Sequence, residues 1–337
     1  MRYQLLGHSG LRVSELCLGT MTFGEDWGWG ASEAESRKIF DRFAEAGGTF
    51  VDTANNYTNG TSERFVGQFL SADRDHFVLA TKYTLTERPE DPNFGGNHRK
   101  NLIRSLEGSL QRLGTDHVDL LWLHMWDGMT PIEEVMRTMD DVVRAGKVHY
   151  VGFSDTPAWV VSQAVTMAEH RGWTRPVAIQ VPYSILDRGV ERDLLPMARS
   201  LNLAVATWGM LEGGVLTGKY RQQGSEPRRS SSASPAELAA GDAVLALAGE
   251  IGRTPAQVAL GWIRARRDRA RILPILGART VAQLEDALGC LDVELTGDQV
   301  RALDDVAPID LGFPHSFLGS DHVRGLIFGD TYNLIDR

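Results

Sequence analysis

Four side chains that can hold or move a proton follow consecutive apolar runs in the first part of the chain. Asp52 lies near the end of one run, Tyr57 lies in the loop after it, Lys82 ends the next run and His124 ends the one after that. Each alone has an ordinary explanation, as a turn carboxylate, a packed phenol, a surface cation or a core imidazole. Their coincidence at successive run ends favours a chemical role.

The residue types indicate which chemistry this would be. A phenol is a poor acid near neutral pH, but a neighbouring ammonium favours its ionised form and lowers its pKa. We therefore expect Lys82 to tune Tyr57, and Asp52 to keep Lys82 charged and aimed. His124 would hydrogen-bond a substrate oxygen or the phenol. Such a set suits protonation of a carbonyl oxygen as negative charge develops on it.

A regular scaffold is needed to bring these residues together, and the sequence predicts one. Eight short, mostly apolar runs alternate with segments of helical period. This alternation predicts an α/β fold, an (α/β)8 TIM barrel, in which catalytic groups lie at the carboxyl ends of the strands. The runs cover residues 16–21, 49–54, 77–82, 118–124, 148–154, 178–183, 204–209 and 272–277.

The expected helices have recognisable starts and stops. Four pairs have the spacing of a capping box, and three prolines suit a first helical position: Ser32 with Glu35, Thr130 with Glu133, Thr254 with Gln257, Thr280 with Gln283, and Pro131, Pro157 and Pro255. Residues 99–113 keep one apolar face, and Gly114 supplies a stop.

Three segments depart from the alternation, although no linker divides the chain, so we expect a single domain over residues 1–337. Residues 1–15 are expected to form a hairpin or lid over the barrel bottom. Residues 225–238 are rich in Ser, Pro and Arg and predict a mobile mouth loop. Residues 307–337 follow the last expected helix and could cross the barrel mouth.

Composition excludes several classes of protein. A net charge of −9 argues against nucleic acid as a partner, and no apolar run is long enough to span a membrane. Cys17 and Cys290 cannot build a disulfide framework. None of the nine histidines belongs to an HxH or HExxH motif, so no metal site is expected. The amino terminus lacks an apolar signal-peptide core, which predicts a cytoplasmic protein.

Reduction of a carbonyl requires a hydride donor, and the late strands offer a place for one. The chain has no strand-linked GxGxxG, P-loop or GxSxG motif, so a dinucleotide would bind by another route. After the seventh run, Trp208 could stack on a flat ring, and Gly213, Gly214 and Gly218 would let the backbone approach phosphates. After the eighth, Arg279 and the helix start at Thr280 form an anion site.

The sequence resembles the aldo-keto reductases from LGHSGLRVSELCLGTMTFG to about residue 305. The motifs FVDTANNY, LATK, SLQRLGTDHVDLLWLH, GKVHYVGFSD, IQVPYS, GGVLTGKY and LPILGAR occur in family order with similar spacing. Within the family, the chain is most similar to the bacterial and potassium-channel β-subunit-like branches.

The resemblance implies a barrel that reduces aldehydes or ketones with NADPH, or alternatively NADH. It makes Tyr57 the general acid, with Asp52, Lys82 and His124 around it. Ser154, Asp155 and Gln180 would hold the nicotinamide carboxamide, and Trp208 would stack on its ring. The full set of implied cofactor-binding residues is Thr20, Met21, Asp52, Ser154, Asp155, Gln180, Trp208, Gly209, Met210, Leu211, Gly213, Gly214, Lys219, Gly277, Ala278, Arg279, Gln283 and Asp286.

Three positions depart from the family pattern. Asp155 stands where Asn is common, and a carboxylate can accept but not donate a hydrogen bond. The loop after the seventh run reads TWGML where Ser-Pro-Leu is frequent. Ala287 replaces an Asn near the adenine.

Residues of the mouth loops are expected to determine the substrate specificity. Trp27, Trp29, Tyr83, Met125 and Trp126, with the tail near Phe313 and Phe317, would form an aromatic pocket for a small carbonyl compound. Such a pocket suits hydrophobic aldehydes or ketones, and sugars also bind to tryptophan faces. The alternative function is a nicotinamide-binding regulatory subunit with little turnover. The sequence does not indicate an oligomeric state.

Overall fold

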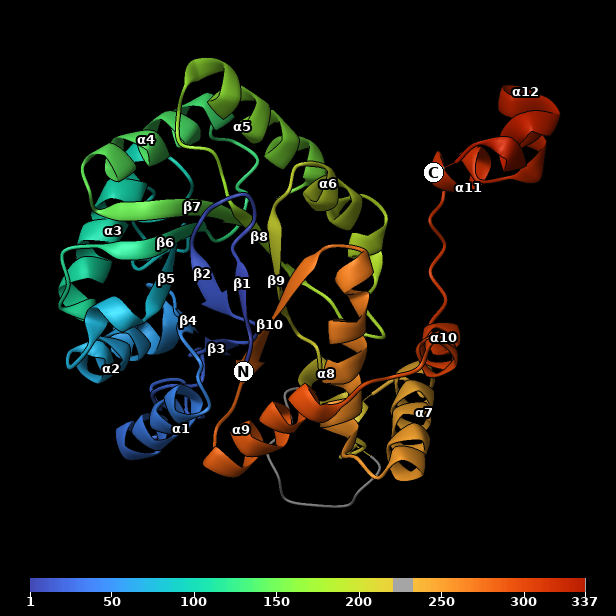
Figure 1. Ribbon diagram of the computed structural model, residues 1–337. Helices are drawn as coiled ribbons and strands as arrows, with labels where there is room; N and C mark the ends of the chain where they lie inside the picture. The colour runs from blue at the N-terminus through green and yellow to red at the C-terminus, as the bar shows by residue number, and fades with distance from the viewer. Residues whose placement is uncertain (221–232, 337) are drawn as a thin grey trace.

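Eight parallel strands form a closed barrel in the computed structural model, which describes residues 1–220 and 233–336 (Figure 1). The order around the barrel is β10, β3, β4, β5, β6, β7, β8 and β9. Their bounds are β3 Cys17–Gly19, β4 Phe50–Asp52, β5 Val78–Tyr83, β6 Val118–Leu123, β7 Val148–Ser154, β8 Ala178–Pro182, β9 Ala204–Trp208 and β10 Arg271–Gly277. All eight runs of the sequence are therefore barrel strands, and the predicted TIM barrel is confirmed.

Helices surround the strands. They are α1 Glu33–Glu45, α2 Thr61–Leu70, α3 Arg99–Leu113, α4 Ile132–Arg144, α5 Ala158–Arg171, α6 Leu194–Ser200, α7 Pro235–Ile251, α8 Pro255–Ala265, α9 Val281–Leu288, α10 Gly297–Val306, α11 His315–Leu318 and α12 Asp321–Phe328. Short 3-10 helices are η1 Tyr57–Gly60, η2 Arg74–His76, η3 Gly189–Glu191, η4 Glu212–Thr217, η5 Arg266–Asp268, η6 Gly289–Asp292 and η7 Gly329–Leu334. Within the described ranges, every helix is too short or too polar to span a bilayer.

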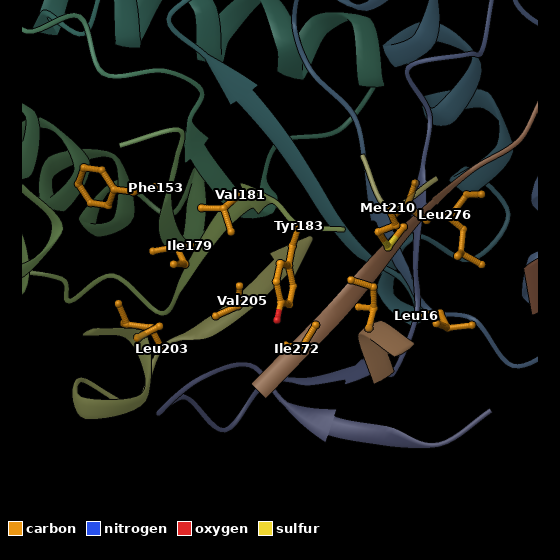
Figure 2. Close-up of a cluster of buried hydrophobic side chains, with 14 of the residues drawn as sticks. Leu16, Phe153, Ile179, Val181, Tyr183, Leu203, Val205, Met210, Ile272 and Leu276 are labelled. Carbon is orange, nitrogen blue, oxygen red and sulfur yellow. The ribbon is translucent and has the colours of Figure 1, made fainter. Parts of the chain in front are cut away.

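The strands bury side chains on both faces, which is why their sequences are apolar throughout. One layer packs between strands and helices, and Figure 2 shows a part of it formed by Phe153, Ile179, Val181, Val205 and Ile272, among others. A second, smaller layer fills the lower barrel interior with residues such as Phe50, Leu120 and Trp122. Successive strand residues belong to alternate layers, as the two-residue period of a strand requires.

The amino-terminal segment closes the barrel bottom, the end formed by the amino ends of the strands. β1 (Tyr3–Leu5) and β2 (Arg12–Ser14) pair antiparallel, which confirms the predicted hairpin. Leu6 and Val13 are fully buried against the interior layer. At Gly7 the backbone has φ +60°, and a Cβ would lie 2.1 Å from the Val177 carbonyl oxygen, so only glycine fits this approach.

Most predicted helix starts are confirmed. Ser32, Thr254 and Thr280 accept hydrogen bonds from the backbone three residues on, and Gly114 ends α3 in the left-handed conformation. Thr130 is an exception because its hydroxyl donates to Asp127, so the predicted capping box at Thr130 is wrong. Pro131 and Pro157 precede the first helical residue instead of occupying it.

Two predicted irregular segments need correction. Residues 225–238 were expected to form a loop, but α7 begins at Pro235, and Ser234 and Glu237 form a capping box. The S-P-A-E signal for this start is present in the sequence. Residues 225–232 of the expected loop lie outside the described residues.

The tail from residue 307 does not cross the barrel mouth as expected. After α10 the chain extends away from the barrel to α11 and α12 (Figure 1). Arg188 and Arg192 donate to the carbonyls of Asp304 and Asp310, which holds this turn of the chain outside the mouth. Phe313 and Phe317 are 83% and 55% exposed, so they do not line a pocket in this chain.

Candidate active site

Lys82 is the centre of a buried polar cluster at the mouth, the end formed by the carboxyl ends of the strands. Its Nζ lies 2.5 Å from Asp52 Oδ2, 2.9 Å from the Tyr57 hydroxyl and 2.9 Å from the Thr53 carbonyl oxygen. Lys82 is fully buried. Gln180 Nε2 donates to the other oxygen of Asp52 at 3.1 Å. The predicted contacts of Lys82 with Asp52 and Tyr57 are thus present.

Strand geometry explains the convergence. Asp52 pairs in register with Ala80 of β5, and Lys82 lies two residues further toward the mouth, on the same face. A side chain on the inner face of a barrel strand must stay inside the barrel, so Lys82 can satisfy its ammonium only with groups at the top of the interior. β4 and the loop after it supply those groups.

Electrostatics makes Lys82 a cation and Tyr57 a protonated phenol. Burial opposes the charge of Lys82, but Asp52 and Tyr57 outweigh it and raise the pKa of Lys82 above its usual range. Burial also raises the pKa of Tyr57; Lys82 acts to lower it, and Asp52 adds to the rise. The expected effect of Lys82 on Tyr57 is therefore present, but the prediction of a net lowered pKa is wrong because burial is the larger effect. Tyr57 is therefore kept protonated.

His124 faces the same cluster in its neutral form. Burial, with a further contribution from the charge of Lys82, lowers the pKa of His124 to about 3. The rings of His124 and Tyr57 are 6.0 Å apart and nearly perpendicular. His124 Nδ1 is buried and has no partner among the described residues. A neutral imidazole has one donor nitrogen and one acceptor nitrogen, so His124 is suited to hydrogen-bond an uncharged carbonyl group.

The loop that carries Tyr57 is held in a strained conformation. Thr58 and Asn59 have φ values of 45° and 54°, in the left-handed region that side chains disfavour. The Thr58 hydroxyl donates to the Phe23 carbonyl at 2.6 Å and accepts from Ser62 N at 3.1 Å. The strain is thus maintained by contacts to two other segments, and it fixes the direction of the tyrosine.

Asp155 lies beside this cluster at the end of β7. Its φ is 42°, and its Oδ1 is buried and has no partner among the described residues. Burial raises the pKa of Asp155 to about 6, although the neighbouring Trp208 and Lys82 act to lower it. The neighbouring predicted residues Ser154 and Gln180 are buried and pair in register. These polar groups lie side by side, and Asp155 Oδ1 is left able to accept a hydrogen bond.

The loop after β9 exposes backbone at two consecutive glycines, Gly213 and Gly214. Gly213 and Gly214 have φ values of 59° and 96°. A Cβ at Gly214 would lie 2.2 Å from Lys219 Cε, so the lysine chain runs across this glycine. Trp208 is 41% exposed at the mouth, whereas the Met210 side chain is packed in the outer layer (Figure 2). Only the backbone of Met210 is left to contact a ligand.

The turn from β10 into α9 carries the residues of the expected anion site. Arg279 N donates to Gln283 Oε1 at 2.9 Å, and within the described part of the chain its guanidinium has no carboxylate partner. Asp286 differs from the expectation, because its Oδ1 accepts from Thr254 and Gln257 at the start of α8. That engagement gives Asp286 a structural role between α8 and α9.

The remaining cofactor-side residues border the same face. The Thr20 hydroxyl donates to the Asp52 carbonyl, Ala278 is buried with its carbonyl accepting from Thr22, and Met21, Gly209, Leu211 and Gly277 retain exposed surface. Gly277 is the last residue of β10, and the others lie in the segments directly after β3, β9 and β10, all of which end at the mouth.

The expected substrate pocket is only partly assembled. Trp27 and Trp29 form a tilted pair with centroids 5.7 Å apart, and Met125 is 42% exposed. Trp126 is half-buried, and its backbone N–H donates to the Asp155 carbonyl. Tyr83 is 1% exposed and belongs to the outer layer, so its assignment to the pocket is wrong. Tyr83 follows Lys82 directly, and alternation turns it to the opposite face of β5.

Two residues near the site were missed by sequence reasoning. Both polar side-chain atoms of Asn55, Nδ2 and Oδ1, are buried and have no hydrogen-bond partner among the described residues. In the sequence, Asn55 lies between Asp52 and Tyr57. Glu63 is fully buried and accepts from Thr81 at 2.6 Å and from Arg112 at 2.6 Å, which ties α2 to β5. The spacing of Glu63 from Val66 and Leu70 could have indicated that it is buried, because the three residues share the buried face of α2.

Fold and site together describe an (α/β)8 barrel with a buried phenol, cation and carboxylate in contact at its mouth. The chain belongs to the aldo/keto reductase family, whose model matches residues 15–308.

Similar proteins include several fungal enzymes. The norsolorinic acid reductase stcV of Emericella nidulans is 39% identical over 320 residues, which cover 92% of this chain and 82% of that protein. The aryl-alcohol dehydrogenase [NADP(+)] of Phanerodontia chrysosporium is 35% identical over 363 residues, covering 99% and 91%. The norsolorinic acid reductase of Aspergillus flavus is 37% identical over 324 residues, covering 93% and 83%.

Proposed function

We propose that this protein interconverts an aromatic aldehyde or ketone and the corresponding alcohol, with NADPH as its cofactor. The observation that carries the proposal is the buried contact of Lys82 with both Asp52 and Tyr57. Burial keeps the phenol protonated, and the contact places a cation beside it to stabilise the phenolate that proton donation would leave.

The chain's own residues account for the proton transfer. Tyr57 donates its hydroxyl proton to the carbonyl oxygen as negative charge develops there. Lys82 stabilises the resulting phenolate, and Asp52 keeps Lys82 charged and in place. His124, being neutral, orients the carbonyl oxygen by a hydrogen bond. A bound nicotinamide cofactor supplies the hydride that, with this proton, completes the two-electron reduction.

The polar groups left unmet at the mouth fit a nicotinamide dinucleotide. Asp155 and Gln180 would hold its carboxamide, and the exposed face of Trp208 would contact its ring. The backbone at Gly213 and Gly214 would follow the pyrophosphate, since both glycines have positive φ and no side chain of their own, and the side chain of Lys219 lies directly over Gly214. The guanidinium of Arg279, which has no carboxylate partner among the described residues, supports binding of the 2′-phosphate that distinguishes NADPH from NADH.

The mouth favours an aromatic substrate over a sugar. Trp27, Trp29 and Trp126 offer flat apolar faces, and Met125 adds an adaptable thioether. The names of the similar fungal proteins include an NADP(+)-dependent aryl-alcohol dehydrogenase, which supports the same choice. The alternative of a regulatory subunit with little turnover is less favoured, because Asp52, Lys82 and Tyr57 are in contact.

Turnover and binding must be measured separately to test this proposal. NADPH oxidation is followed with a panel of aryl aldehydes, aryl ketones and aldose sugars, and cofactor affinity is measured by fluorescence titration. We expect steady turnover with the aryl compounds. Tyr57→Phe should reduce kcat by a factor on the order of 10³ while cofactor affinity persists, since proton transfer contributes on the order of 10²–10⁴. A wild type that binds NADPH yet oxidises it no faster than Tyr57→Phe contradicts the reductase function, and turnover of sugars alone contradicts the substrate class.

A further inference from the structure

Two histidines and an aspartate meet at the barrel bottom, far from Tyr57. His117 immediately precedes β6, Asp119 lies within β6 and His149 lies in β7. The β6–β7 register pairs Val118 with Val148 and Leu120 with Tyr150, so Asp119 stands opposite His149. His117 is two residues before Asp119, and side chains two apart share one face of a strand. The sheet therefore presents three ligand-type side chains side by side.

Their donor atoms are close to one another. One ligand atom from each of the three residues lies within 4.8 Å of the other two. His149 Nδ1 is 3.4 Å from Asp119 Oδ1, and the two imidazole rings have centroids 4.6 Å apart. Tetrahedral zinc with bonds of about 2.0–2.2 Å separates its ligand atoms by about 3.4 Å. Small side-chain rotations would close the cluster to that spacing.

We propose that His117, Asp119 and His149 form a binding site for a divalent transition metal, with Zn²⁺ as its typical occupant. Two imidazoles and one carboxylate suit zinc, whereas Mg²⁺ and Ca²⁺ prefer sites made of oxygen atoms. His149 is 47% exposed at its side chain, so water can complete the coordination. The sequence hides the site because its ligands come from two strands and form no contiguous histidine motif.

Neighbouring groups already orient two of the ligands. Asp116 Oδ1 accepts a hydrogen bond from His117 Nδ1 at 2.8 Å, which leaves Nε2 with its lone pair. A carboxylate behind a ligating histidine is a common feature of zinc sites. Asp119 Oδ2 is held at 2.8 Å by both Arg74 Nη2 and Leu79 N, which leaves Oδ1 directed toward His149.

The nearby charge of Arg74 sets the strength of the site. Its positive charge partly neutralises the Asp119 carboxylate and repels a metal cation. We therefore expect micromolar affinity and not the tight binding of a structural zinc site. A metal here would join β6 to β7 at the amino ends of the strands. The active site lies at the opposite ends, so metal binding should raise thermal stability without changing turnover.

Isothermal titration of the wild type with ZnCl₂, and separately with MgCl₂, tests the proposal. We expect one zinc ion to bind per chain with micromolar affinity, and no magnesium binding. CoCl₂ should give the visible absorption bands of a low-symmetry nitrogen–oxygen site. Zinc should also raise the melting temperature of the wild type.

Matched variants locate the binding. His117→Ala and His149→Ala should each weaken zinc binding at least tenfold, and Asp116→Asn should weaken it by up to about tenfold. His170→Ala removes an exposed histidine on α5 and should change nothing. His149→Gln replaces His149→Ala if the latter fails to fold, as judged by circular dichroism. Absence of zinc binding, or binding that survives both His149 substitutions, overturns the proposal.

Discussion

The two ends of this barrel are built on opposite principles. At the mouth, Lys82 and Asp52 are buried charges, and atoms of Asn55, His124 and Asp155 have no hydrogen-bond partner among the described residues. At the bottom, Leu6 and Val13 of the hairpin cover an apolar interior. There Ser14 accepts hydrogen bonds from the backbone of Thr49 and Phe50, so polar groups of the hairpin are satisfied.

Backbone strain follows the same division. Six residues other than glycine have positive φ in the described chain, and five of them lie in loops after strands, at the mouth: Thr58, Asn59, Thr84, Asp155 and Glu212. The sixth, Asn202, precedes β9. Strain and unmet polar groups decrease stability and persist where the surrounding structure enforces them. The comparison indicates that packing at the bottom stabilises the fold and offsets the strain and the unpaired polar groups at the mouth.

The largest effect is expected from Lys82→Met, which should damage both function and stability. Turnover should fall by a factor on the order of 10³, because Tyr57 loses the cation beside it. The buried carboxylate of Asp52 would lose its ion pair, which typically costs about 3–5 kcal/mol of unfolding free energy. Urea denaturation and steady-state kinetics measure the two effects. The double variant Lys82→Met/Asp52→Asn should recover stability but not activity; recovery of activity would show that the ion pair has no chemical role.

A change at the bottom should affect stability alone. Leu6→Ala removes a fully buried side chain and should lower the free energy of unfolding by about 2–5 kcal/mol, with kcat unchanged. Leu5→Ala is the matched control, since Leu5 is 43% exposed and its loss should cost less than about 0.5 kcal/mol. A fall in kcat of folded Leu6→Ala would contradict the proposed separation of the two ends.

Arg279→Ala tests the cofactor side of the mouth. Loss of the guanidinium should weaken NADPH binding about tenfold, equivalent to about 1.4 kcal/mol, and leave NADH binding nearly unchanged. Fluorescence titration with both cofactors measures the ratio, and Arg37→Ala, at an exposed arginine of α1 that pairs with Asp41, serves as control. Equal losses for NADPH and NADH would remove the assignment of Arg279 to the 2′-phosphate.

The smallest effect is expected from Asp155→Asn, and it should depend on pH. The pKa of Asp155 is raised from 3.8 to about 6 in the folded protein, so folding favours its protonated form. The carboxylate therefore destabilises the fold increasingly as pH rises from about 4 through 6. A neutral Asn avoids this cost and should stabilise the protein by about 1 kcal/mol at pH 8, and by less at pH 5. A stability difference that is the same in urea denaturation at both pH values would contradict this explanation.

Much of the architecture was determined by local sequence pattern. The apolar runs fixed the eight strands because a strand buried on both faces tolerates few polar residues. The polar residues that end those runs identified Asp52, Lys82 and His124, since the carboxyl ends of parallel strands must meet at one end of a barrel. Capping residues such as Ser32 and Thr254 determined helix starts because their hydrogen bonds reach only three residues along the chain.

Only the tertiary structure decided matters that depend on distance and burial. The net pKa of Tyr57 reflects desolvation that no spacing reveals, and Asp286 bonds to Thr254 and Gln257 of a neighbouring helix. Tyr83 is in the core although Lys82, one residue before it, is in the site. His117 and His149 are 32 residues apart in sequence, and the β6–β7 register alone brings them together. Local pattern sets which face a residue takes, whereas packing between segments sets its neighbours and its access to water.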